Sequence, residues 1–143
     1  MARIEESIDI KCLIDKAFTY TTDAKNWPNW QTFIPEAEQT SPGQVEVGTT
    51  FRGTNHMMGM SMKWTAETTE YQPTSKWSKK ITAGSINIQE IMNYNPLEGG
   101  TKFTIVYEMN IGGFMKLFSP MIVNSMRKET RKSLINLKRV LEA

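Results

Sequence analysis

Apolar and polar residues alternate from the start of the chain. Ile4, Ile8 and Ile10 fall on one face of a period-2 pattern, and mainly charged residues fall on the other. This alternation is typical of a half-buried strand. Residues 13–21 then carry apolar side chains at helical spacing, until the segment around Pro28 interrupts the pattern. The pattern predicts a strand, then a short helix, then a second short helix or turn.

Beyond Pro35, turn-forming residues divide the chain into stretches of roughly ten residues that read as strands. The turn signals lie at 41–43, 59, 72–73, 83–84 and 95–100. We predict a meander of about six strands in this region. The clearest strand is residues 101–111, in which every second side chain is large and apolar: Phe103, Ile105, Tyr107, Met109 and Ile111.

A long C-terminal helix follows, because no turn residue occurs from Met121 to Ala143. Ser119-Pro120 has the arrangement of an N-cap followed by a proline in the first turn. An inward stripe at helical spacing is formed by Val123, Met126, Thr130, Leu134, Leu137 and Leu141. Strand, short helices, several strands and a long helix, in that order, predict an α+β fold in a single domain over residues 1–143.

The composition and charge of the chain exclude several classes of protein function. The chain has 143 residues and a net charge of +2, far below the basic excess of a nucleic-acid-binding domain. No apolar run reaches the length of a membrane helix, and the N-terminus lacks the apolar core of a secretory signal. We therefore expect a cytoplasmic protein, a monomer or weak dimer, without integral membrane association. With one cysteine, Cys12, and one histidine, His56, we expect no disulfide, metal or cofactor.

Several short motifs, spread over almost the whole chain, resemble the START-like superfamily that includes polyketide cyclases and dehydrases. They are Ile8-x-Ile10, Ala17-Phe18, Asp23, Trp27-Pro28-x-Trp30, Val47-Gly48-Thr49, Gly99-Gly100-Thr101 and Leu134-x-x-Leu137-Lys138-x-x-x-Glu142. The resemblance implies a helix-grip fold, in which a curved antiparallel sheet of six to seven strands wraps around the C-terminal helix. It also implies a cavity between sheet and helix.

We expect the cavity to be lined by residues on the inner faces of the strands and on the inward side of the helix. The expected ligand-binding residues are Trp30, Phe33, Phe51, Met62, Trp64, Ile88, Glu90, Met92, Tyr107, Met109, Met121 and Met126. Apolar walls with few polar groups are typical of small-molecule sites. An alternative for Trp30 and the other tryptophans is ordinary core packing.

The chain contains ten methionines, and four of them lie at the predicted hairpin tip around Gly59: Met57, Met58, Met60 and Met62. Thioether side chains are flexible and polarizable, so they can repack around varied apolar shapes. The cluster suggests a pocket mouth, or an exposed mobile tip. Since the three residues nearest Gly59 cannot all point inward from a turn, at least one is expected to be exposed.

Glu90 is the strongest candidate for a catalytic residue. In residues 86–94 the even positions are apolar except Glu90, so strict alternation directs its carboxylate inward. Such a carboxylate needs a partner, and Arg127 lies close to the inward direction of the C-terminal helix. With Tyr107 as a donor from the next strand, Glu90 could act as a general acid or base. The alternatives are a structural ion pair, or a bulge near Gln89 that turns Glu90 outward.

The leading hypothesis is a non-enzymatic protein that binds a small, mostly hydrophobic molecule between sheet and helix. An enzyme of the cyclase or dehydratase kind, acting on a polyketide-like substrate, is the alternative, and its catalytic candidates are Glu90, Tyr107 and Arg127. A third hypothesis is an activator of a chaperone ATPase, because a neighbouring branch of the superfamily is similar in its double-tryptophan segment. In that case the surface would matter, and not the cavity.

Overall fold

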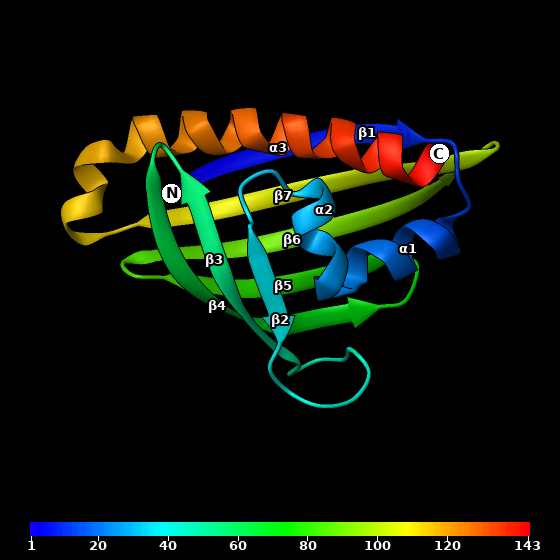
Figure 1. Cartoon of the computed structure of the whole chain (residues 1–143), viewed down its shortest axis with the longest axis horizontal. Helices are drawn as coiled ribbons and strands as arrows, with labels where there is room; N and C mark the ends of the chain where they lie inside the picture. Colours follow the sequence, from blue (N-terminus) through cyan, green and yellow to red (C-terminus); the bar gives the residue numbers. More distant parts are fainter.

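The computed structural model describes residues 1–143 as a curved seven-stranded sheet and a long helix (Figure 1). Two short helices follow the first strand. All neighbouring strands are antiparallel, in the order β1-β7-β6-β5-β4-β3-β2. The elements are β1 (Ala2–Ile10), α1 (Ile14–Thr22), η1 (Ala24–Asn26), α2 (Trp27–Trp30), β2 (Glu36–Gln39), β3 (Thr50–Met57), β4 (Met60–Gln72), β5 (Lys76–Ala83), β6 (Ile86–Leu97), β7 (Gly100–Ile111), η2 (Gly113–Phe118) and α3 (Ser119–Glu142).

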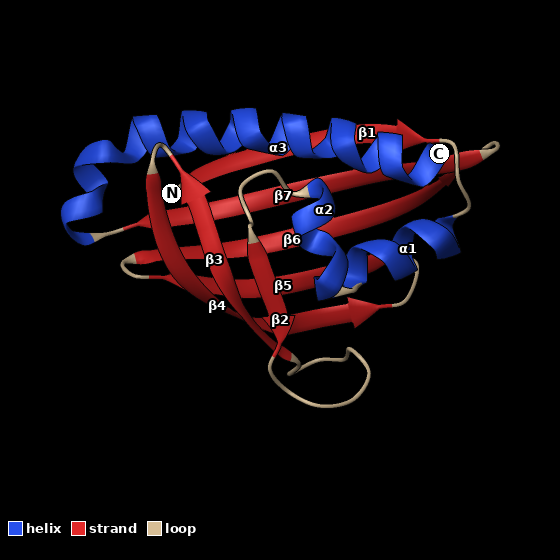
Figure 2. Ribbon diagram, viewed as in Figure 1, coloured by secondary structure: helices blue, strands red, loops and turns tan.

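The helix α3 runs along the sheet (Figure 2), with its strand contacts mainly to β1. The helices α1 and α2 complete the cover over the sheet. This arrangement confirms the predicted α+β class and the helix-grip architecture. One cluster of 29 buried apolar residues fills the space between these layers. No helix is long and apolar enough to cross a membrane.

The predicted alternation in β7 is confirmed, because all five residues of its apolar face are buried. Val106, on the opposite face, is buried as well. The strand β6 is longer than predicted: it continues through Pro96 to Leu97, and the turn is confined to Glu98 and Gly99. Proline is tolerated there because the strand is ending and its last residues are exposed.

The start of α3 differs from the sequence prediction. Ser119 lies inside the helix, and the N-cap is Phe118, which forms no side-chain capping hydrogen bond. The reason is that the 3-10 helix η2 runs directly into α3. Gly113 has a φ of +61°, which only glycine adopts without strain, and it lets the chain turn from β7 into η2.

A glycine in β3 allows a tryptophan to lie across the sheet. Gly53 pairs with Trp64 of β4, and the ring of Trp64 passes over the glycine. A Cβ atom at Gly53 would lie 2.5 Å from the Trp64 ring and 2.5 Å from the backbone oxygen of Glu36. Neither neighbour can move freely, because one is buried and the other belongs to β2.

We therefore expect Gly53→Ala to lower the free energy of unfolding by about 1–3 kcal/mol through overpacking. Urea unfolding followed by tryptophan fluorescence measures this change. Gly112→Ala is the matched control, since its Cβ would meet only the Ser85 carbonyl oxygen at 3.3 Å. Equal effects of the two substitutions would contradict the role assigned to Gly53.

Candidate functional site

A small cavity of about 30 Å³ lies inside the molecule, between the strands β3 to β7 and the helix α3. Four of its lining residues are polar, and the others are apolar. The lining consists of Trp27, Gln31, Phe33, Ile34, Asn55, Trp64, Lys79, Ile81, Ile88, Glu90, Tyr107 and Met126. The volume is sufficient for a water molecule but not for a larger ligand without movement of side chains.

Glu90 lies inside the molecule with 3% of its surface exposed, as the alternation in residues 86–94 predicts. Its partner is Lys79, whose Nζ lies 2.8 Å from Oε1 of Glu90. The prediction that Arg127 pairs with Glu90 is wrong: the Arg127 guanidinium donates to Oδ1 of Asn124, one turn earlier on α3. Lys79 is favoured because it lies directly opposite Glu90 on the neighbouring strand.

Lys79 is not among the residues predicted from the sequence, although the pattern of β5 indicates it. The inner face of β5 reads Trp77, Lys79, Ile81, Ala83, so alternation places a lysine among apolar residues. The two-residue turn between Ala83 and Ile86 then sets the register that brings residue 79 opposite residue 90. The same hairpin argument therefore predicts the ion pair.

Aromatic rings surround the Lys79 ammonium group. Its Nζ lies 3.7 Å from the ring centroid of Trp77, 4.3 Å from that of Trp27 and 5.9 Å from that of Phe51. These contacts are within cation–π range and partly replace the lost hydration of the charge. Burial lowers the pKa of Lys79 from its ordinary value, and the charge and hydrogen bond of Glu90 act in the opposite direction.

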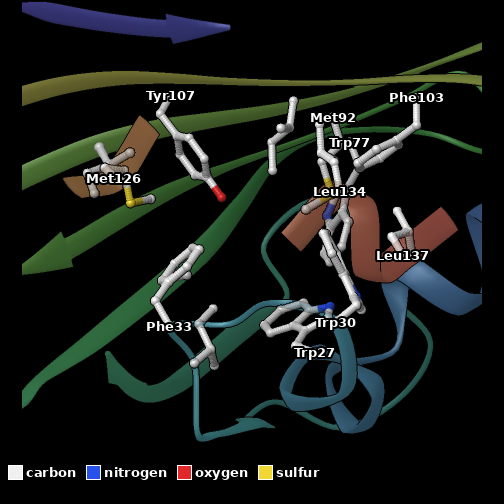
Figure 3. Close-up of a cluster of buried hydrophobic side chains, with 14 of the residues drawn as sticks. Trp27, Trp30, Phe33, Trp77, Met92, Phe103, Tyr107, Met126, Leu134 and Leu137 are labelled. Carbon is white, nitrogen blue, oxygen red and sulfur yellow. The ribbon is translucent and has the colours of Figure 1, made fainter. Parts of the chain in front are cut away.

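Lys79 and Glu90 belong to a row of inward residues on neighbouring strands, which continues to Thr68 on one side and Tyr107 on the other. Thr68 accepts a hydrogen bond of 3.2 Å from Nε1 of Trp77. Tyr107 points into the interior toward Phe33 (Figure 3). Burial raises the pKa of Tyr107 well above its usual value, and Glu90 raises it further, so the phenol stays protonated as a hydrogen-bond donor.

Three side chains that line the cavity have a buried polar atom without a hydrogen-bond partner. These atoms are Oε1 of Gln31, Oδ1 of Asn55 and Nε1 of Trp64. Each such atom costs about 1–3 kcal/mol when it stays unpaired. Sequence patterning gave no indication of Gln31, because it lies in a loop without periodicity.

The segment that carries Gln31 is held in place from two sides. The backbone N–H of Thr32 donates to Oγ of Ser133 on α3 at 3.0 Å. The backbone oxygen of Phe33 accepts from the N–H of His56 on β3 at 2.8 Å. Gln31, Phe33 and the following Ile34 are thereby fixed over the cavity.

The predicted ligand-binding residues divide into three groups. Six line the cavity: Phe33, Trp64, Ile88, Glu90, Tyr107 and Met126. Others belong to the packed core or its edge and do not line the cavity: Trp30, Phe51, Met62, Met92 and Met109. Met121 is wrong as an inward residue, because 60% of its surface is exposed. The first turn of α3 lies at the end of the sheet where β6 begins and β7 ends (Figure 1).

The methionine cluster behaves as predicted at its tip, where Met58 and Met60 are exposed at 45% and 52%. Met57 and Met62 are half-buried and pack against the core. His56 is exposed, and its Nδ1 lies 3.0 Å from Oγ of Ser61. No group of three histidine, cysteine, aspartate or glutamate side chains is arranged to hold a metal ion.

A larger hollow, of about 510 Å³, lies along β2, β3 and β4. Its lining includes the exposed ion pair of Arg52 and Glu38, and mostly polar residues. Exposed pairs of this kind bind weakly and exchange with water. We therefore place the candidate site in the smaller interior cavity, where charges and unpaired polar atoms are buried.

Residues 1–142 match the family described as "Polyketide cyclase / dehydrase and lipid transport". The chain belongs to this family. No curated protein matches the chain. The family match agrees with the resemblance seen in the sequence motifs, and family membership implies a cavity that binds hydrophobic ligands.

Solved structures share the fold of this family member. TTHA0849 from Thermus thermophilus has a TM-score of 0.82 at 13% identity, over 96% of this chain and 95% of its own. The ZhuI aromatase/cyclase from Streptomyces has a TM-score of 0.80 at 13% identity, over 99% and 93%. The Aha1 protein from Colwellia psychrerythraea, solved as a dimer, has a TM-score of 0.67 at 16% identity, over 99% and 97%. At these identities the similarity establishes the fold alone.

The buried ion pair makes a quantitative prediction. Glu90→Gln or Lys79→Met should each lower the free energy of unfolding by about 3–5 kcal/mol, because the remaining charge is left buried without its partner. The double variant should lose much less than the sum of the two. Urea unfolding of all four proteins measures the coupling. Arg127→Met combined with Glu90→Gln is the control, and its effects should add.

A second prediction concerns alkaline pH. Burial raises the pKa of Tyr94 and Tyr107 above the ordinary value of about 10. The folded state therefore holds their protons where the unfolded state releases them, so this stabilisation is present below about pH 10 and is lost as pH rises further. Each tyrosine should reduce the free energy of unfolding by about 1.4 kcal/mol per pH unit in that range.

Urea unfolding at several alkaline pH values measures this slope. Tyr107→Phe should make it shallower by about one tyrosine's contribution. The control is Tyr20→Phe, at a half-buried position. An unchanged slope in Tyr107→Phe would show that this phenol ionises equally well in the folded protein.

Proposed function

We propose that this protein binds a small, mostly hydrophobic molecule in the space between the sheet and α3, without converting it. The observation that carries the proposal is the interior cavity with mainly apolar walls and a few convergent polar groups. This combination is typical of small-molecule sites. Family membership supports the same assignment, since its description includes lipid transport.

Binding requires the cavity to expand, because its volume of about 30 Å³ is much smaller than an apolar ligand. Met126 of α3 lines the cavity, and the half-buried Met57 and Met62 pack against the core. Unbranched thioether side chains change rotamer at low cost. The methionines are therefore the side chains that would move when a ligand enters.

An enzyme of the cyclase or dehydratase kind is the second candidate, and one arrangement favours it. Glu90 and Tyr107 lie opposite each other on neighbouring strands and both line the cavity. The protonated Tyr107 could donate to a ligand carbonyl, with Glu90 as the base. The close ion pair with Lys79 favours a structural role for Glu90, so binding without turnover is the first proposal. Arg127 does not line the cavity, so we assign it no role in binding or in catalysis.

Native mass spectrometry of the purified protein should show a retained hydrophobic adduct. The neutral dye N-phenyl-1-naphthylamine should bind with a blue-shifted, enhanced emission. Met126→Ala should enlarge the cavity, change the affinity for the dye several-fold and cost about 2–5 kcal/mol of stability. Met121→Ala is the matched control on the same helix, and it should change neither quantity appreciably.

The proposal fails if the wild-type protein carries no adduct and does not bind the dye, while Met126→Ala loses stability without gaining dye binding. That result would show Met126 to be an ordinary core residue. Conversion of the retained molecule by the wild-type protein, but not by Glu90→Gln, would instead establish the enzyme.

A further inference from the structure

The unpaired polar atoms in the cavity wall indicate which hydrogen-bonding groups a ligand should carry. Gln31 and Trp64 are both more than nine-tenths buried, and neither Oε1 of Gln31 nor Nε1 of Trp64 has a hydrogen-bond partner. Oδ1 of Asn55 is unpaired as well, and all three side chains line the same space. The set contains two acceptors and one donor, so a complementary group must both donate and accept.

Three of the five buried side-chain atoms without a hydrogen-bond partner belong to the cavity wall, and the other two belong to Trp30 and Ser78. Trp27 donates its indole N–H to the backbone oxygen of Thr21 at 2.7 Å, and Trp77 donates to Thr68. Trp30 also has an unpaired indole N–H, but it does not line the cavity. Trp64 is the only tryptophan that combines an unpaired donor with a place in the cavity wall.

The charged residues in the cavity wall indicate whether the ligand is charged or neutral. Lys79 and Glu90 are the only charged residues that line the cavity, and they neutralise each other at 2.8 Å. A carboxylate or ammonium in the ligand would therefore add an uncompensated charge to a buried space, which is strongly unfavourable. An uncharged polar group avoids this cost.

We propose that the ligand is an apolar molecule carrying an uncharged hydroxyl group, a phenol or an alcohol, which accepts a hydrogen bond from Trp64 and donates one to the amide oxygen of Gln31 or Asn55. A hydroxyl accepts up to two hydrogen bonds and donates one, so it can pair with the Trp64 N–H and with one of the two unpaired amide oxygens. The rest of the molecule packs against apolar walls that include Phe33, Ile34 and Ile88. This inference rests on the proposed binding function and names the ligand class for that cavity.

Three compounds with one apolar skeleton test the inference by isothermal titration: 2-naphthol, naphthalene and 2-naphthoate. At about pH 7 the first two are neutral and the third is charged. We expect 2-naphthol to bind at least about tenfold more tightly than either of the others, since it alone can accept from Trp64 and donate to an amide oxygen without adding a charge. In NMR spectra of the indole N–H groups, the Trp64 signal should shift with 2-naphthol much more than the Trp27 and Trp77 signals.

Trp64→Phe removes the donor and keeps an aromatic ring, so the preference for 2-naphthol over naphthalene should fall several-fold. Gln31→Leu is a second variant with the same expectation, should Trp64→Phe fold poorly. Trp30→Phe is the matched control, because it removes an unpaired N–H outside the cavity, and it should keep the preference.

The outcomes separate the two proposals. Equal binding of 2-naphthol and naphthalene would leave hydrophobic binding intact and overturn the hydroxyl inference, as would tightest binding of 2-naphthoate. Failure of all three compounds, together with failure of the neutral dye, would overturn both proposals.

Discussion

The ion pair between Lys79 and Glu90 is the constraint on which the interior of this protein depends. Both groups are buried, so neither charge is stable without the other. Their contact exists only in one register of β5 and β6, since a shift by one residue would turn each side chain to the opposite face. The apolar neighbours of the pair would turn outward in the same shift, so burial of the core and pairing of the charges select the same register.

The elements around the pair are arranged to hold its charged groups. Trp27, from the short helix α2, and Trp77, from β5, place their rings against the ammonium of Lys79. Each indole is fixed by its own N–H, one to the backbone before α2 and the other to Thr68 on β4. The result is a rigid aromatic and charged end of the cavity. Phe33, Ile34 and Met126 contribute apolar side chains to the cavity wall.

The apolar and polar parts of the cavity wall have different roles in ligand binding. Lys79 and Glu90 neutralise each other's charge. In the same cavity wall, one polar atom each of Gln31, Asn55 and Trp64 has no hydrogen-bond partner. Apolar walls provide the affinity expected of hydrophobic contact, and unpaired polar atoms provide orientation. Met126, a flexible side chain, belongs both to the core and to the cavity wall.

The sequence by itself determined the fold class, the inward faces of β6 and β7, and the burial of Glu90, because these follow from local periodicity. The same periodicity in β5, together with the two-residue turn after Ala83, also places Lys79 opposite Glu90. Only the tertiary structure decided that Arg127 does not reach Glu90 and that Met121 is exposed. Periodicity gives the direction of a side chain, whereas pairing and cavity volume depend on the distances between elements that are far apart in the chain.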